Sequence, residues 1–567
     1  MYSKRLIITT LTALFLNLAS SAFCETYYLD AVNGDDSNSG TSNSPWRTVA
    51  KAQSVVQPGD KVILSNGDYD AFTPPNSIYD GDATQSLADT TIHWITWQAK
   101  PGHTPTFNAI YLEREGNKYF LGYWLKGLKF HWLSTKNIVA LNIENCEVIG
   151  CNDSIDTAYG GLSFNSSSNI YVADSKIHFI RDNGVSISNS CHVTVANCDV
   201  YDIGVDHFTL RTEYSDCVNI RIIGNTIRNT MQWNSSAHPD GIQCYASSGN
   251  GFRNCVIAGN KMYNMGVQGI FTSAINGVFA DGVIENNLIY DCGSSTLNIA
   301  NTSNLIFRNN TVFGYSAFSS SCTNLSVYNN IFYGSYILRD PYNLKYNDYN
   351  IYSQDYTDWL KGTEPHSYMY PREQLAAMLG ELFTDAADDD YSIRSNCIAV
   401  DFCPQSPAAA YDDILDQPRD SLPDAGCYEI MGDTPPPVEE PLDEEPPAEE
   451  PPAAEEPPAE EPPAEEPPAD DGTDDGTSND IPHPRVQKQI DSVNRTMTCT
   501  DARYEMQIGR MDSLKDKISS RDMLQEKKDK KIDRIDTKIE KIDLSYERKM
   551  ELLTQKLSQL VSSANTD

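Results

Sequence analysis

Four short segments of the chain share one pattern and carry the residues best suited to chemistry. The segments are 183–188, 206–211, 240–245 and 268–273. One apolar position is common to all four, and in a β-strand it should point into a core. Alternation then turns these side chains outward onto one face: His207, Thr209, Arg211, Gln243, Tyr245, Phe271 and Ser273. Asp206 and Asp240 begin their segments, and Arg181 and His238 lie on the adjoining turns.

Two carboxylates on neighbouring repeats suit acid–base chemistry on a glycan. Asp206 and Asp240 can serve as acid and base, or they can hold a cation such as Ca²⁺, although the sequence gives no complete ligand set. Carboxyl groups about 5 Å apart would suit a retaining glycosidase, and a wider separation an inverting one. Alternatively, a His and a Tyr can remove and return the C5 proton of a uronate while Arg211 neutralises its carboxylate, as a lyase or an epimerase requires.

The predicted site comprises nine residues. The predicted catalytic residues are Asp206, His207, Asp240, His238 and Arg211. The predicted substrate-binding residues are Gln243, Tyr245, Arg181 and Phe271. Tyr245 and Phe271 offer flat apolar faces to sugar rings, and no residue is assigned as a metal ligand. The alternative for each residue is structural, because Asp before a strand commonly makes a turn and an outward His or Arg is commonly just solvated.

A stack of short strands is needed to bring these segments together, and the chain contains a repeat that builds one. The pattern apolar–x–apolar–x–x–Asn–x–apolar recurs at steps of 20 to 35 residues. Its Asn residues are Asn225, Asn260, Asn287, Asn310 and Asn330, and earlier copies place Cys146, Ser175 and Cys198 there. One coil cannot bury its inward face alone, so coils must stack in parallel at about 4.8 Å with equivalent residues above one another. We therefore predict an all-β parallel β-helix in which the Asn column is a structural ladder.

Several segments of this body resemble a known group of proteins. Residues 27–37, Pro45-Trp46, 58–64, 95–102 and 424–429 look like secreted right-handed β-helix proteins of the pectin-lyase-like superfamily. The resemblance covers Tyr27 to Met431 and implies that fold; its members are often polysaccharide lyases, hydrolases or epimerases. Residues 238–243 are similar to the first Asp motif of pectin-degrading hydrolases. The next repeat, however, has Val267 and Gln268 where those enzymes carry an Asp pair.

Changes in composition along the chain predict four parts. Residues 1–24 form a signal peptide, because Lys4 and Arg5 precede an apolar run too short to span a bilayer. Residues 25–432 form the β-helix, whose open end a helix from Pro45 to Val56 would cap. Residues 433–483 are an acidic, Pro-rich, disordered spacer. Residues 484–562 show heptad spacing and predict a coiled coil that joins copies of the chain or docks on a partner helix; a single solvated helix is the alternative.

The net charge and the predicted export of the chain limit which partners and cellular locations are expected. The net charge of −36 argues against nucleic acid, and beyond the N-terminus no segment is apolar enough to span a membrane. The protein is therefore expected outside the cell, on its surface or in the periplasm. The leading prediction is a polysaccharide-active protein, either a lyase, an epimerase or a hydrolase, that acts on an acidic glycan. The rival is a non-catalytic glycan-binding or adhesive surface protein multimerised by its coiled coil.

Overall fold

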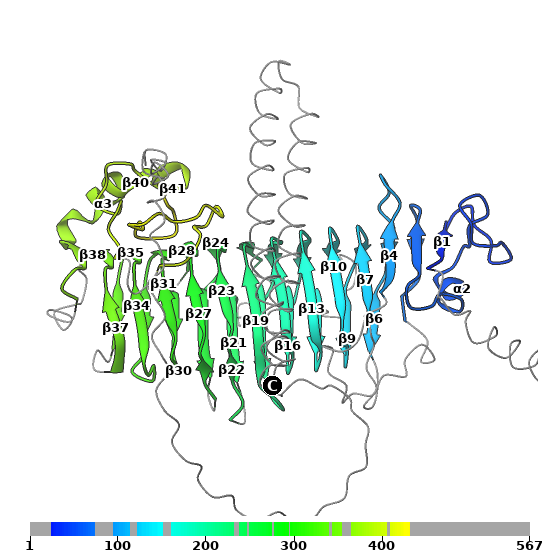
Figure 1. The fold of residues 1–567 in the computed structure, drawn as a ribbon, viewed down its shortest axis with the longest axis horizontal. Coiled ribbons are helices and arrows are strands. Elements are labelled where there is room, and N and C mark those ends of the chain that lie inside the picture. Colours follow the sequence, from blue (N-terminus) through cyan, green and yellow to red (C-terminus); the bar gives the residue numbers. More distant parts are fainter. Residues whose placement is uncertain are drawn as a thin grey trace, which may run out of the picture. The chain divides into compact units, whose positions relative to one another are not determined.

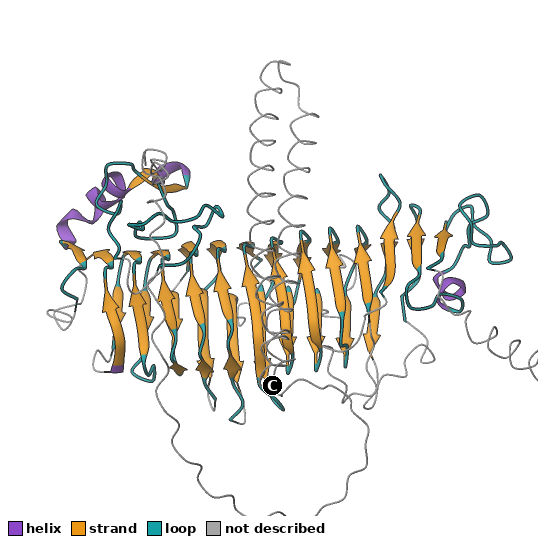
Figure 2. Cartoon of the chain, viewed as in Figure 1, coloured by secondary structure: helices purple, strands orange, loops and turns teal. Residues whose placement is uncertain are grey.

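A computed structural model defines the main body of the chain. It describes residues 24–73, 94–113, 122–150, 160–231, 238–246, 249–274, 277–293, 295–339, 343–353, 364–404 and 409–430. All of these fall within the first of two compact units, Met1–Pro441, and strand is their dominant secondary structure (Figure 2). Residues 1–23 of the predicted signal peptide, the predicted spacer (433–483) and the predicted coiled coil (484–562) lie outside the described residues.

The strands wind into a parallel β-helix, in which each full coil gives one strand to each of three sheets (Figure 1). Within the described residues these sheets have 16, 13 and 10 strands. The first sheet contains β1 (Thr26–Leu29), β2 (Lys61–Leu64), β4 (Ile95–Ala99), β7 (Tyr123–Lys126), β10 (Leu141–Glu144), β13 (Ser168–Ala173), β16 (Cys191–Ala196), β19 (Cys217–Ile223), β23 (Val256–Ala258), β27 (Val283–Glu285), β31 (Ile306–Arg308), β34 (Leu325–Tyr328) and β37 (Leu344–Asp348), with β22 (Phe252–Arg253), β26 (Phe279–Ala280) and β30 (Thr302–Ser303) beside this path.

The second sheet contains β3 (Asp68–Tyr69), β5 (Thr106–Phe107), β8 (Lys129–Phe130), β11 (Glu147–Ile149), β14 (Lys176–Ile180), β17 (Asp199–Ile203), β20 (Thr226–Thr230), β24 (Lys261–Met265), β28 (Leu288–Cys292), β32 (Thr311–Phe313), β35 (Ile331–Tyr333), β38 (Ile351–Ser353) and β39 (Tyr368–Tyr370). The third sheet contains β6 (Ile110–Glu113), β9 (Leu133–Lys136), β12 (Leu162–Asn165), β15 (Val185–Ser188), β18 (Phe208–Thr212), β21 (Asp240–Ala246), β25 (Gln268–Ala274), β29 (Ser295–Ile299), β33 (Ser316–Phe318) and β36 (Tyr336–Leu338).

Alternating side chains build the core of the β-helix. In the third sheet, Val185 pairs in parallel with Phe208, which pairs with Ile242, and Ile242 pairs with Ile270. All four are fully buried, which confirms the predicted inward column. Because the register is continuous, residues before and after this column also lie above one another from coil to coil. The fold therefore aligns the polar residues of the predicted site.

The Asn column forms the predicted ladder. The backbone N–H and the Nδ2 of Asn225 both donate to Asn260 Oδ1 at 3.0 Å. The same pair of bonds joins each following rung, and the ladder runs one rung further than predicted, to Asn350. The left-handed backbone of this turn belongs to the preceding residue, such as Gly224 or Asn286, at φ 65° and 55°. Each ladder Asn thus satisfies backbone and side-chain donors of a neighbouring coil inside the core.

A short helix covers the N-terminal end of the solenoid. Helix α2 (Val49–Gln53) buries Val49 and Ala52, and Thr48 caps it by accepting from the N–H of Lys51 at 3.1 Å. The prediction that the helix starts at Pro45 is wrong. The N–H of Trp46 donates to the carbonyl of Tyr28, which keeps that stretch extended. The predicted strands at 27–29 and 61–64 are present as β1 and β2.

The C-terminal part of the body packs on the outside of the second sheet (Figure 1). Its elements are η4 (Arg372–Gln374), α3 (Leu375–Leu382), β40 (Phe383–Asp385), η5 (Ala386–Asp388) and β41 (Asp390–Ile393). Tyr290, Phe313 and Ile331 point outward from the second sheet and form a second hydrophobic core with Met378 and Phe383. The outward face of the second sheet, which would otherwise be exposed to solvent, is therefore buried at this end.

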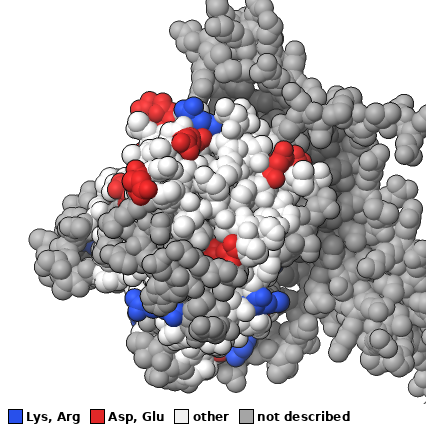
Figure 3. All heavy atoms as spheres, turned by 90° about the vertical axis from the view of Figure 1, so that its left-hand side faces the viewer, with Lys and Arg blue, Asp and Glu red and all other residues white. Residues whose placement is uncertain are grey.

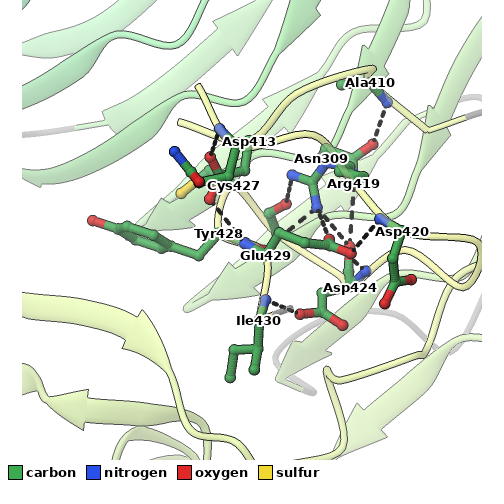
Figure 4. Close-up of polar contacts among 12 residues, drawn as sticks. Asn309, Ala410, Asp413, Arg419, Asp420, Asp424, Cys427, Tyr428, Glu429 and Ile430 are labelled. Atoms are coloured by element: carbon green, nitrogen blue, oxygen red, sulfur yellow. Dashed lines mark hydrogen bonds and ion pairs between the residues drawn. The ribbon is translucent and has the colours of Figure 1, made fainter. Parts of the chain in front are cut away.

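Residues 409–430 contain a buried ion pair and are hydrogen-bonded to the β-helix (Figure 4). Arg419 Nη1 lies 2.8 Å from Glu429 Oε2, and the two side chains are only 2% and 0% exposed. Arg419 Nη2 also donates to Asn286 Oδ1 at 2.9 Å. Asn309 adds two contacts, because its Nδ2 donates to the carbonyl of Asp424 and its Oδ1 accepts from the N–H of Ala410. This segment is held against the turns between the first and second sheets.

The C-terminal end of the β-helix carries no concentrated charge in the view of Figure 3, where acidic and basic groups are scattered over a mainly uncharged described surface. Within the described ranges, no helix is long and apolar enough to cross a membrane.

Candidate functional site on the third sheet

A column of polar residues marks the start of successive third-sheet strands. Its members are Asn183, Asp206, Asp240, Gln268 and Ser295. The N–H of Asp240 donates to Asp206 Oδ1 at 3.0 Å, and the N–H of Asp206 donates to Asn183 Oδ1 at 3.3 Å. The prediction that Asp206 and Asp240 lie on neighbouring coils is therefore confirmed, and a direct hydrogen bond connects the two residues.

Both carboxyl groups are held in an environment that disfavours their charge. Asp206 and Asp240 are 3% and 0% exposed. Burial raises the pKa of Asp206 to about 7, and the nearby Asp240 carboxylate adds to the rise. Burial likewise raises the pKa of Asp240 to about 6, while His238 works against that rise. Two like charges stacked this closely favour a state in which the pair keeps one proton near neutral pH.

The contacts of Thr209 fit a protonated Asp206. Thr209 Oγ1 lies 2.8 Å from Asn183 Oδ1 and 3.0 Å from Asp206 Oδ2. A hydroxyl has one proton to donate. If Thr209 donates to Asn183, it can accept from a protonated Asp206, so both contacts are satisfied.

His238 lies beside the buried pair and is accessible from outside. Its side chain is 54% exposed, and its Nδ1 lies 3.4 Å from Asp240 Oδ1, an oxygen that accepts no hydrogen bond. Asp240 Oδ2 accepts from Gln243 Nε2 at 3.1 Å. The His238 ring also lies 5.9 Å, between centroids, from the ring of Phe271 on the next coil. An accessible imidazole is thus placed over a buried carboxylate, an arrangement that can stabilise an imidazolium during proton transfer.

The predicted outward orientation of His207 is wrong. The side chain is fully buried, and its Nε2 lies 2.9 Å from the carbonyl oxygen of Arg228. Burial lowers the pKa of His207. Strand β18 begins one residue later, at Phe208, so His207 occupies the corner where the adjacent coils have Gly184 and Gly241. Strand alternation does not extend to this corner, and His207 has no access to a glycan.

The remaining predicted residues surround this centre on the outer face. Arg211 and Tyr245 pair across adjacent strands, and the Arg211 guanidinium lies 6.0 Å from the Tyr245 ring centroid. Both are exposed, whereas Gln243 and Phe271 are half-buried on the same face. Arg181 is half-buried on the turn between β14 and β15, two residues before Asn183.

Three residues of the site were not among the predicted ones: Asn183, Thr209 and Gln268. Asn183 and Gln268 occupy the same register position as the two Asp residues. The shared first position of the four segments was the signal that could have found Asn183 and Gln268, whereas Thr209 was predicted only to lie on the outer face. Gln268 is buried, and its Oε1 has no hydrogen-bond partner.

The described residues contain no group of three or more His, Cys, Asp or Glu side chains that could hold a metal ion. Asp206 and Asp240 lie on adjacent coils but form no such group. Three of their four oxygens already take part in hydrogen bonds within the protein, whereas Ca²⁺ takes six to eight oxygen ligands.

The chain belongs to the Pel9A-like right-handed β-helix family, whose model, described as "Pel9A-like, right handed beta helix region", matches residues 27–346. This confirms the predicted handedness. No curated protein matches the chain.

Among solved structures, the chain is similar to XylC in complex with xylose, with 10% identity, a TM-score of 0.45, and coverage of 72% of this chain and 98% of that one. It is also similar to the pectate lyase Pel9A, with 15% identity, a TM-score of 0.36, and coverage of 72% and 96%. A third similar structure is the A-module of the Azotobacter vinelandii mannuronan C-5 epimerase AlgE4, with 13% identity, a TM-score of 0.37, and coverage of 55% and 87%. These likenesses concern the fold alone.

Proposed function

We propose that the protein acts on an acidic polysaccharide that lies on the outer face of the third sheet, and that His238 transfers a proton there. The observation that carries this proposal is the contact between the half-exposed His238 ring and the buried Asp240 carboxylate. Membership of a family named after Pel9A, itself a pectate lyase, supports a polysaccharide substrate.

The proposed reaction begins with removal of the C5 proton of a uronate. His238 takes the proton as the neutral imidazole, and Asp240 stabilises the imidazolium that forms. Arg211, exposed on the same face, faces the substrate carboxylate and stabilises the negative charge that develops there. In a lyase, the electron pair forms the C4–C5 double bond as the C4–O bond breaks, and the leaving oxygen takes a proton. In an epimerase, a proton returns to C5 from the opposite side.

Tyr245 supplies the second proton carrier in this proposal. It lies two residues beyond Gln243 on β21, which places it about 7 Å further along the strand. One sugar ring fits between it and the region near His238. Its hydroxyl can then donate to the leaving oxygen or to C5 from the side opposite His238.

Burial of the carboxylates makes hydrolysis the weaker alternative. A glycosidase needs two carboxyl groups that flank the scissile bond. Asp206 and Asp240 have almost no exposed surface, and Asp206 Oδ1 is occupied by the N–H of Asp240. Their arrangement suits the support of His238 better than direct attack on a sugar.

A digestion panel with matched variants tests this proposal. The full chain is incubated with polygalacturonate, alginate and neutral xylan, and unsaturated uronates, new reducing ends and epimerised residues are measured. His238→Ala should lower turnover of the acidic polymer at least about 100-fold. His366→Ala is the matched control, because His366 is likewise exposed and lies 2.7 Å from a buried carboxylate, that of Asp348, at the end of the first sheet. No product from any polymer, or equal losses in the two variants, would contradict the proposal.

A non-catalytic glycan-binding protein is the second candidate. Burial removes three of the five predicted catalytic residues from the surface: Asp206, Asp240 and His207. A binder would hold the polymer without changing it, and Asp240→Asn would leave its affinity intact. Affinity electrophoresis in a gel that contains the polymer, followed by product analysis, separates the two candidates.

We also propose that the protein is exported and that residues 484–562 join copies of the chain. The positive N-terminal residues before a short apolar run support the first proposal, and the heptad spacing supports the second. Light scattering of the full chain should give a multiple of the monomer mass, and a monomer would contradict assembly.

A further inference from the structure

Phe179, at the edge of the candidate site, is an exception to the residue type that the following coils place at its position. The residue next to last in β14 has a left-handed backbone, with φ 53°. The same register position in the four following coils is also left-handed, and it is occupied by Asp202, Asn229, Asn264 and Asp291. Asn and Asp tolerate this conformation, whereas a bulky aromatic residue does not. The chain therefore places a strained aromatic residue where its own repeat uses Asx.

Packing does not offset this strain. The Phe179 side chain is 46% exposed. Its aromatic neighbour is the ring of His178, with centroids 5.2 Å apart and planes tilted by 60°. A half-exposed ring gains only part of the free energy that burial provides. Strain without compensation from the fold is typical of residues that contact a ligand.

The turn that carries Phe179 leads directly into the site. Asn183, four residues later, accepts from the N–H of Asp206 and lies within hydrogen-bond distance of Thr209. Four residues of extended chain span at most about 14 Å, so the ring lies within a few sugar lengths of Asp206. Burial raises the pKa of Asp182 in the same turn, and the nearby guanidinium of Arg211 on the outer face partly opposes that rise.

We infer that Phe179 is a sugar-binding platform at the corner between the second and third sheets. Its exposed ring stacks on the apolar C–H face of a pyranose ring in the polysaccharide chain. This inference rests on the proposed function, and it extends the bound glycan from the third-sheet face around the corner to β14.

Stability and affinity should change in opposite directions when Phe179 is replaced by Asn. Phe179→Asn restores the residue type of the repeat, so the melting temperature of the full chain should rise by about 1–3 °C. Loss of the ring should weaken binding about five- to tenfold, measured by affinity electrophoresis with polygalacturonate and with alginate. Phe179→Tyr keeps the ring and should retain affinity. Tyr411→Ala, which removes an exposed ring from residues 409–430, is the control and should bind as the wild type does.

The outcomes separate this inference from the proposed function. If Phe179→Asn lowers the melting temperature, or binds as tightly as the wild type, Phe179 has no ligand role and only this inference fails. If the wild-type protein binds neither polymer, the proposed function fails as well.

Discussion

Replacing Asp206 with Asn should stabilise the protein at neutral and alkaline pH, and the gain should shrink toward pH 4. Burial raises the pKa of this carboxyl group from 3.8 to about 7. The folded protein therefore binds the proton more tightly than the unfolded chain does. It follows that ionisation lowers the free energy of unfolding as pH rises from 3.8 to about 7, and that no such loss exists well below 3.8.

The size of the effect follows from the two pKa values. A difference of about 3 pH units corresponds to about 4 kcal/mol. Because Asp240 shares the site and the group retains slight exposure, we expect a gain of about 2–4 kcal/mol at pH 8 and about 1–2 kcal/mol at pH 5. Asn fits the position structurally, since Asn183 occupies it one coil earlier. Its carbonyl can still accept from the N–H of Asp240, and its amide can donate to Thr209.

Urea unfolding of the full chain at pH 5 and pH 8, followed by circular dichroism and tryptophan fluorescence, measures this difference. Asp216→Asn is a control of opposite sign. Burial works against it, but hydrogen bonds from Arg253 and from the N–H of Gly251 lower the pKa of Asp216. Its carboxylate therefore stabilises the fold above 3.8, and the variant should lose stability at pH 8. A variant of Asp206 that is less stable than the wild type at pH 8, or whose gain does not depend on pH, would refute the reasoning.

Asn287→Ala should lower the free energy of unfolding by about 3–5 kcal/mol, because five hydrogen bonds, four of them buried, converge on this side chain. Urea unfolding measures this loss, and the outward Asn142→Ala should change the free energy of unfolding by less than about 0.5 kcal/mol. Arg419→Met leaves a buried carboxylate without its cation and should cost about 3–5 kcal/mol. Hydrogen exchange in residues 409–430 should then accelerate, and unchanged exchange would show that Arg419 does not hold this segment against the β-helix. Asn183→Asp places a third carboxyl group in the column beside Asp206, so the free energy of unfolding in urea should fall more at pH 8 than at pH 5. An equal change at both pH values would contradict this prediction.

The repeating part of the structure could be predicted from the sequence because its physics is local and periodic. An apolar residue at every second position and an Asn at each turn suffice to set the coil, its register and the ladder. The contact between Asp206 and Asp240 follows from that register alone. The handedness followed from the resemblance to known β-helix proteins rather than from the pattern of residues.

The features that could not be predicted lie where periodicity stops. His207 stands at a corner, and the sequence does not show that β18 begins only at Phe208. The contact of His238 depends on the path of a turn whose length differs from coil to coil. The bond between Arg419 and Asn286 joins residues 133 positions apart, and no repeat unit encodes such a contact.

Folding alone does not explain why the third-sheet column contains Asp at two adjacent positions. Asn183 shows that an amide satisfies the hydrogen bonds of this position, and the Asn ladder shows how readily this chain stacks amides in its interior. Burial raises the pKa of both carboxyl groups, and the Asp240 carboxylate adds to the rise at Asp206, so ionisation of the pair destabilises the folded state near neutral pH. Functional sites characteristically keep residues that lower the stability of the fold although another residue type at the same position would stabilise it. If Asp206→Asn proves more stable, the carboxyl pair must serve the chemistry next to His238 rather than the architecture of the β-helix.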